Sequence, residues 1–232
     1  MTAEFLGTAG LLATVVGSGI MAERLAGGNV ALALLANTLA TGAMLVALIL
    51  TFGKISGAHF NPAVTISDAL VKGIAWRDAA AYVAAQIIGA MTGVGAANVM
   101  FGLPVFFWSQ KERTGAAQWF SEFVAAFGLL AVIWGCSRLQ TAIVVPFAVA
   151  AYITAAYWFT ASTSFANPAV TIARSMSDTF AGIRLADVFG FVIAQFLGAF
   201  AATLLFRWLV PVTPEDAETI ILPHDGEKKE NL

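Results

Sequence analysis

The tripeptide Asn-Pro-Ala occurs twice in this chain, starting at Asn61 and again at Asn167. Proline suits the first position of a helix, where it has no amide hydrogen to lose, and asparagine suits the capping position before it. Each motif therefore predicts the start of a short helix. If the asparagine oxygen binds the backbone, the side-chain amide is left to donate to a neutral solute. The indicated chemistry is recognition by hydrogen bonding. Each copy of the motif consists of three residues, Asn61, Pro62 and Ala63 in the first and Asn167, Pro168 and Ala169 in the second.

Other reactive chemistry is sparse. The chain has one cysteine, Cys136, and no nucleophile triad, cluster of metal ligands or phosphate-binding loop. We therefore expect no enzyme activity, no metal site and no cofactor. The net charge is −2 and no basic patch occurs, so no nucleic-acid partner is expected.

The composition indicates a membrane protein. Of 232 residues, 59% are hydrophobic and 11% charged, whereas soluble domains carry about 25% charged residues. A span needs about 20 apolar residues, and backbone within lipid must satisfy its own hydrogen bonds, so the long uncharged stretches are predicted helices. The first charge is Glu4 and no basic start precedes it, which argues against a signal peptide. The six predicted spans are 4–23, 30–52, 79–101, 117–137, 140–160 and 186–208.

Both motifs lie in apolar stretches, about 58–71 and 163–177, that are too short to span. Non-helical backbone at membrane depth is tolerated only where it lines a cavity or is buried in protein. We therefore predict two re-entrant loops with half-helices that line a pore. Half-helices that enter from opposite faces bring their positive ends together, which repels cations, including hydronium, at the middle of the bilayer.

The two halves of the sequence repeat each other. "HFNPAVTI" at 59–66 returns as "FANPAVTIAR" at 165–174, and "AAQIIGA" at 84–90 returns as "IAQFLGA" at 193–199. Three spans per half is an odd number, so the second half must enter the membrane from the opposite side. The fold class is thus an all-α membrane protein of six spans and two half-helices. We expect one domain, 1–210, with halves of about 1–110 and 117–210. The polar tail, 211–232, has the composition of a disordered segment.

These motifs, with "AEF" in the first span and "AQ..GA" in the third and sixth, resemble the aquaporin and aquaglyceroporin (major intrinsic protein) family over residues 3–208. The resemblance implies a passive channel for small neutral solutes, a homotetramer with one pore per subunit, cytoplasmic termini and a place in the inner (plasma) membrane. The distribution of Lys and Arg among the loops favours the same orientation weakly. Membrane lipid is then the surrounding partner.

Family members narrow their pore outside the paired motifs, and the four positions transfer here by their spacing from each motif asparagine. The expected filter residues are Thr41, Ala155, Ser164 and Val170. Most of the family has arginine where this chain has Val170. A filter with no aromatic and no charge predicts a wide pore and resembles a bacterial subset linked with metalloid permeation. Glycerol, urea and neutral As(OH)3 are the expected solutes, with some water; a water-selective channel is the alternative.

Ionisable side chains in or beside the apolar stretches also have expected roles. Arg174 lies one turn beyond Val170 and is expected at the outer mouth, paired with Asp178; the alternative makes it a displaced filter residue.

Glu4 and Glu122 are expected to brace the re-entrant loops by accepting hydrogen bonds from their backbone amides. Proton coupling in a secondary transporter is the alternative for these carboxylates. His59 is expected in the inner vestibule, with a pH gate as its alternative.

Overall fold

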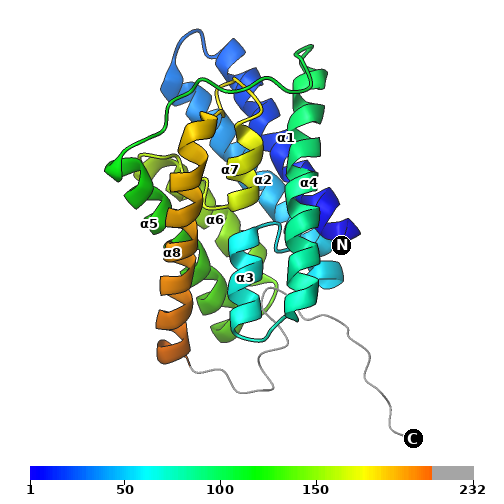
Figure 1. The fold of residues 1–232 in the computed structure, drawn as a ribbon, viewed down its shortest axis with the longest axis vertical. Coiled ribbons are helices and arrows are strands. Elements are labelled where there is room, and N and C mark those ends of the chain that lie inside the picture. The colour runs from blue at the N-terminus through cyan, green and yellow to red at the C-terminus, as the bar shows by residue number, and fades with distance from the viewer. Residues whose placement is uncertain (211–232) are drawn as a thin grey trace, which may run out of the picture.

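The computed structural model describes residues 1–210, and the predicted disorder of the tail lies outside them. In this range the chain forms eight α-helices and a single β-bridge, between Phe107 and Ser177 (Figure 1). The helices are α1 Thr2–Leu25, α2 Val30–Ser56, α3 Pro62–Leu70, α4 Trp76–Met100, α5 Ala116–Leu139, α6 Val144–Phe159, α7 Pro168–Arg174 and α8 Leu185–Leu209.

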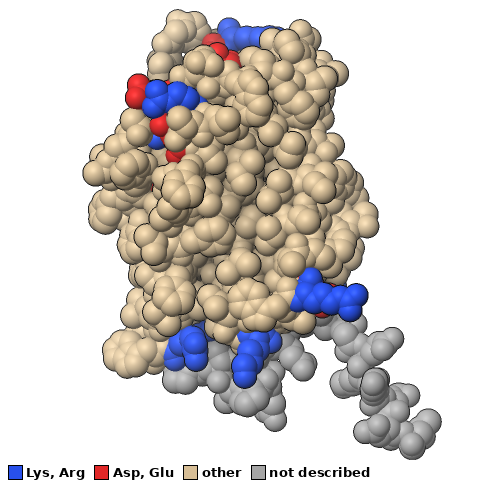
Figure 2. Space-filling model, viewed as in Figure 1, with Lys and Arg blue, Asp and Glu red and all other residues tan. Residues whose placement is uncertain are grey.

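Six of these helices match the predicted spans, and five are 24 to 27 residues long, which suffices to cross a membrane. The other, α6, has 16 residues and starts later than the predicted 140–160. Residues 140–143 turn instead, with the Val144 amide bonded to the Thr141 carbonyl at 2.9 Å. Pro146 falls in the first turn of α6, where the helix needs no amide donor. On the face shown in Figure 2, charged side chains gather at the two ends of the molecule and leave an uncharged band between them.

The long helices pack in repeat-related pairs, α1 against α4 and α5 against α8. Glycines allow these backbones to come close. A Cβ at Gly93 would overlap the Ala9 carbonyl, and a Cβ at Gly198 would overlap that of Phe123. Helices in lipid associate through close packing of small residues, because the apolar tails offer no hydrophobic drive between them. Close contact at a glycine thus joins the paired helices within each half.

The two short helices lie one above the other inside the bundle (Figure 1). α3 packs against α4 and α8, and α7 packs against the same two helices and α1. Each begins at the proline of its Asn-Pro-Ala motif, as predicted. The bundle therefore places the two motifs face to face.

Candidate functional site

Each motif asparagine caps its own half-helix. Asn61 Oδ1 accepts from the Ala63 amide at 2.9 Å, and Asn167 Oδ1 accepts from the Ala169 amide at 3.0 Å. Both asparagines have extended backbone, as an N-cap requires. This geometry leaves the side-chain nitrogen of each asparagine free to turn away from its own helix.

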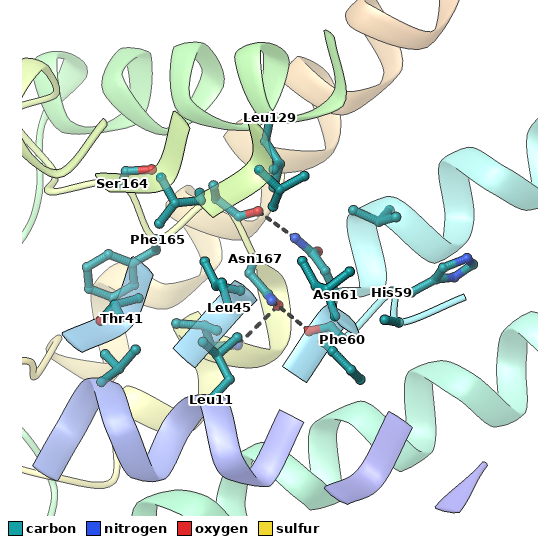
Figure 3. A pocket seen from close by; sticks show the side chains of 18 of the residues that line it. Leu11, Thr41, Leu45, His59, Phe60, Asn61, Leu129, Ser164, Phe165 and Asn167 are labelled. Carbon is teal, nitrogen blue, oxygen red and sulfur yellow. Dashed lines mark hydrogen bonds between the residues drawn. The ribbon is translucent and has the colours of Figure 1, made fainter. Parts of the chain in front are cut away.

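Those nitrogens join the two loops. Asn61 Nδ2 donates to the Ala166 carbonyl, and Asn167 Nδ2 donates to the Phe60 carbonyl, each at 2.8 Å (Figure 3). A carboxamide nitrogen carries two hydrogens, so one on each asparagine remains for a solute. Donation into the lumen was predicted from the two motifs, but this exchange between the loops was not.

Several residues in the loops before the motifs adopt a left-handed backbone conformation that only glycine adopts without cost. Ala58 and Phe60 have φ of 50° and 49°, and Ser164 and Ala166 each have φ of 49°. Such residues cost of order 1–3 kcal/mol each and persist only where the surroundings hold them. Both loops repeat the same strained positions, so a strong bracing contact must hold each one.

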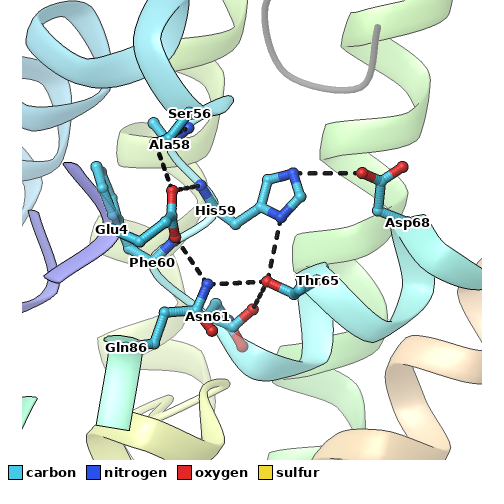
Figure 4. A network of polar contacts seen from close by, with 9 residues as sticks. All are labelled: Glu4, Ser56, Ala58, His59, Phe60, Asn61, Thr65, Asp68 and Gln86. Carbon is cyan, nitrogen blue, oxygen red and sulfur yellow. Dashed lines mark hydrogen bonds and ion pairs between the residues drawn. The ribbon is translucent and has the colours of Figure 1, made fainter. Parts of the chain in front are cut away.

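Glu4 supplies that contact in the first half. Its carboxylate accepts from the His59 amide at 3.0 Å, the Phe60 amide at 2.7 Å and the side chains of Ser56 and Gln86 (Figure 4). The same Gln86 nitrogen donates to Thr65 Oγ1 on α3 at 2.8 Å. The carboxylate therefore ties loop, half-helix and α4 to α1.

Glu122 does the same in the second half. It accepts from the Phe165 and Ala166 amides, both at 2.9 Å, and from Gln195 Nε2 at 2.6 Å. Gln195 also donates to Thr171 on α7 at 2.7 Å. Both carboxylates are fully buried and surrounded by donors. This geometry matches the bracing role rather than the proton-coupling alternative.

Replacing Glu122 with glutamine is expected to lower the stability of the protein. The amide keeps one acceptor and points a donor at backbone amides, so at least one charge-assisted hydrogen bond is lost, at about 1.5–3 kcal/mol. Thermal unfolding in detergent, followed by size-exclusion chromatography, measures the effect. The matched control is Glu112→Gln, because Glu112 is 62% exposed and pairs with Arg184 on the surface, where such pairs contribute about 0–1 kcal/mol. Equal stability of the two variants would contradict the bracing role.

A cavity of about 60 Å³ is lined by both asparagines. Most of the lining is aliphatic, including Leu11, Leu45 and Leu129, and the polar groups are few. Figure 3 shows Thr41 and Ser164 to one side of the asparagine pair and His59 to the other. A mostly apolar wall with convergent donors at one depth binds a neutral solute weakly and leaves a cation without hydration.

Three of the four expected filter residues line this cavity, namely Thr41, Ser164 and Val170. The assignment of Ala155 was wrong, because its side chain is exposed on the outer surface of α6. The face of α6 in the cavity carries Val149, Ile153 and Tyr157, each four residues after the one before. Two residues along a helix turn the side chain by about 200°, so Tyr157 faces inwards where Ala155 faces out. The expected absence of aromatic groups from the lining is therefore also corrected.

Arg174 lies in the cavity lining and is 2% exposed. Its Nε donates to the Ala181 carbonyl, and its guanidinium carbon lies 3.4 Å from the centre of the Phe165 ring. Asp178, the partner expected at the mouth, instead accepts from the Gln110 amide at 2.9 Å. The structure thus favours the alternative position for Arg174 and places a charge where an uncharged filter was expected.

His59 lines the cavity and is buried. Its Nδ1 is 3.1 Å from Thr65 Oγ1, and its Nε2 is 3.5 Å from a carboxylate oxygen of Asp68 (Figure 4). Sequence reasoning missed Asp68. The matching position in the two halves was a signal in the sequence, because Asp68 stands seven residues after Asn61 and Arg174 stands seven after Asn167. In the structure, each of the two contacts the residue that lies two before its own asparagine.

Two half-helices that meet at a polar point inside a cavity, within a bundle of apolar helices, define a multi-pass membrane channel for small solutes. The chain belongs to the major intrinsic protein family, whose model matches residues 1–142 and 135–229. It is 58% identical to the aquaglyceroporin AqpS of Rhizobium meliloti (strain 1021), over 91% of each chain. It is 32% identical to the aquaporin AqpM of Methanothermobacter marburgensis, over 89% of this chain and 95% of that one.

A solved structure supports the fold. The aquaglyceroporin from Plasmodium falciparum superposes with a TM-score of 0.63, covering 90% of this chain and 96% of that chain. At 22% sequence identity, this likeness bears on the fold alone.

Proposed function

We propose that this protein is a passive channel for small uncharged solutes, with glycerol, urea and As(OH)3 as substrates beside some water. The observation that carries the proposal is the pair of asparagine amides inside a largely apolar cavity. Each amide is held by one bond to the opposite loop and keeps one hydrogen for a solute. Donors at fixed positions recognise a hydroxyl or carbonyl oxygen without needing any charge on the solute.

The positive ends of α3 and α7 meet at this point and supply a barrier to cations. Arg174 adds a positive charge to the cavity lining, beside the Phe165 ring. Nothing in this arrangement repels a neutral polyol. As(OH)3 presents three hydroxyl groups as glycerol does, so the same donors suit both. The name of the 58% identical relative, an aquaglyceroporin, supports the choice of glycerol.

Coupled transport is the weaker explanation of the inverted repeat. A coupling ion would need an ionisable group that can release and regain it. Glu4 and Glu122 are each engaged by three or four donors that hold the loops in place. Protonation of either would release the strained loop rather than carry a proton across. The proposal is therefore a pore open to diffusion in either direction.

The proposal includes the membrane, the orientation and the oligomeric state of the channel. Residues 1–210 form one channel domain in the inner (plasma) membrane, with cytoplasmic termini and four copies in a homotetramer. Each copy has its own pore, because the cavity is lined from within a single chain. Exposed aromatic side chains such as Trp108, Trp119 and Trp208 are available to contact lipid or a neighbouring copy.

Solute uptake by proteoliposomes tests the proposal. Vesicles that contain the purified protein are mixed with excess glycerol, urea or arsenite, and their re-swelling is followed by light scattering. Re-swelling in all three solutes, faster than in empty vesicles, is the expected result. Fast water flux with no uptake of glycerol or arsenite would overturn it in favour of the water-selective alternative.

A further inference from the structure

Arg174 and Val170 occupy the same face of α7, four residues apart, and both line the cavity. Four residues of helix advance about 6 Å along the axis. Arg174 therefore lines the same lumen as Val170, but its Cα lies one helical turn further from the asparagine pair. The cavity lining thus contains an arginine although residue 170 is valine.

The guanidinium group of Arg174 is fixed in place. The bond from Nε to the Ala181 carbonyl holds one edge, and the Phe165 ring at 3.4 Å holds one face. Among the described residues, Nε is the only atom of this side chain with a hydrogen bond to the protein. The two terminal nitrogens carry four more hydrogens, which are left for whatever occupies the lumen.

Two hydroxyl groups in the lining come from Thr41 on α2 and Tyr157 on α6. Thr41 Oγ1 and the Tyr157 hydroxyl are 3.3 Å apart, and both residues are buried in the lining. One hydrogen bond joins them, so the pair keeps a donor and acceptor capacity for a solute. Tyr157 also brings an aromatic ring to a wall that is otherwise mostly aliphatic.

A third hydroxyl is left without a partner. Ser164 Oγ is buried and makes no hydrogen bond within residues 1–210, although the residue lines the cavity. Its own backbone amide donates to Ser162 Oγ at 3.2 Å, so the loop is held independently of the serine side chain. A buried hydroxyl without a partner costs free energy unless a ligand or water satisfies it.

We propose that Arg174, Tyr157, Thr41 and Ser164 form the ring that selects solutes in this channel, with Arg174 and Tyr157 in place of Val170 and Ala155. This inference rests on the proposed function and deepens it. The ring offers a fixed fork of donors on one side and three hydroxyl groups around it. The solute class it fits is a small neutral molecule with two or more hydroxyl or amide groups, which can accept from Arg174 while donating to a hydroxyl oxygen.

The positive charges near these four residues favour a neutral solute over a cation. Arg113 also lies over the Phe165 ring, with its guanidinium carbon 5.0 Å from the ring centre. Its hydrogen bonds go to the Gly182 and Ser162 carbonyls, which are neutral acceptors. The buried carboxylate of Glu122, which binds the Phe165 amide, attracts both guanidinium groups and offsets part of their charge. Neither arginine is neutralised by a direct salt bridge within residues 1–210, so both still disfavour the entry of a cation.

Three variants test the ring: Tyr157→Phe, Ser164→Ala and Arg174→Lys. Each removes hydrogen-bonding groups while keeping the size or the charge of the side chain. Loss of one solute hydrogen bond at the barrier is expected to slow glycerol about tenfold. Water is smaller and keeps other partners, so its permeability is expected to fall less. The readout is the ratio of glycerol to water permeability in proteoliposomes.

Ala155→Leu is the matched control, because spacing alone would place residue 155 in the filter whereas its side chain is exposed. Its permeability ratio is expected to equal that of the wild type. Elution as a single size-exclusion peak confirms folding, and Tyr157→Phe and Ser164→Ala decide the matter if Arg174→Lys fails to fold. A wild-type ratio in those two variants, or an altered ratio in Ala155→Leu, would overturn the ring. Failure of the wild type to pass glycerol would instead count against the proposed function, and the ring would then be judged on water permeability alone.

Discussion

Replacing Gly93 or Gly198 with alanine is expected to prevent the channel from folding into a stable bundle. The added Cβ would overlap a backbone carbonyl oxygen of the facing helix, at Ala9 or at Phe123. A backbone atom cannot rotate aside as a side chain can, so the paired helices must separate. Overpacking costs about 1–3 kcal/mol where side chains give way, and a backbone contact places the cost at or above that range.

Purification in detergent measures this effect as the yield of a single size-exclusion peak and its thermal midpoint. Gly135→Ala is the control, because the nearest atom to its new Cβ is a Phe206 ring carbon at 3.5 Å, an ordinary contact. We expect Gly135→Ala to purify as the wild type does. Normal yield and stability of Gly93→Ala or Gly198→Ala would show that these helix pairs do not need close backbone contact.

Replacing Val170 with arginine is expected to lower glycerol and arsenite permeability by at least about tenfold. The new side chain enters the cavity lining one turn from Arg174, on the same face of α7. Its volume narrows the lumen, and two like charges four residues apart repel each other. A barrier raised by about 1.4 kcal/mol through this narrowing slows passage about tenfold, which accounts for the size of the effect.

Val170→Leu separates the effect of side-chain volume from that of charge, because leucine adds volume but neither a charge nor a hydrogen-bond donor. We expect it to slow glycerol less than arginine does. Uptake of glycerol, arsenite and water by proteoliposomes is measured for both variants. An unchanged solute profile in Val170→Arg would place the selecting contacts elsewhere along the cavity.

The helices and half-helices could be predicted from sequence because lipid permits few alternatives. Uncharged stretches of sufficient length must be helical, and a stretch too short to span, with a proline-started turn, must re-enter. The bracing role of Glu4 and Glu122 was predictable for a related reason. A fully buried carboxylate needs donors, and each one recurs beside a loop whose backbone amides lack helical partners.

The filter was predicted less well because spacing along a chain does not determine which way a side chain faces. Counting back from Asn167 across a loop gives Ala155, yet a difference of two residues on α6 decides between lumen and surface. The position of Arg174 depends on its contacts with Phe165 and Ala181, which come from the loops on either side of α7. Such contacts between segments are not visible in a local motif.

One uptake measurement distinguishes passive diffusion of neutral solute past the Asn61–Asn167 pair from coupled transport. Proteoliposomes take up labelled glycerol with and without an imposed proton gradient, beside vesicles with Leu45→Trp, which fills the cavity lining near the pair. We predict that the wild type equilibrates glycerol to the external concentration at the same rate under both conditions, that the gradient persists, and that Leu45→Trp blocks uptake. Accumulation above the external concentration, or collapse of the gradient during uptake, would show that the protein is not a passive channel for neutral solutes.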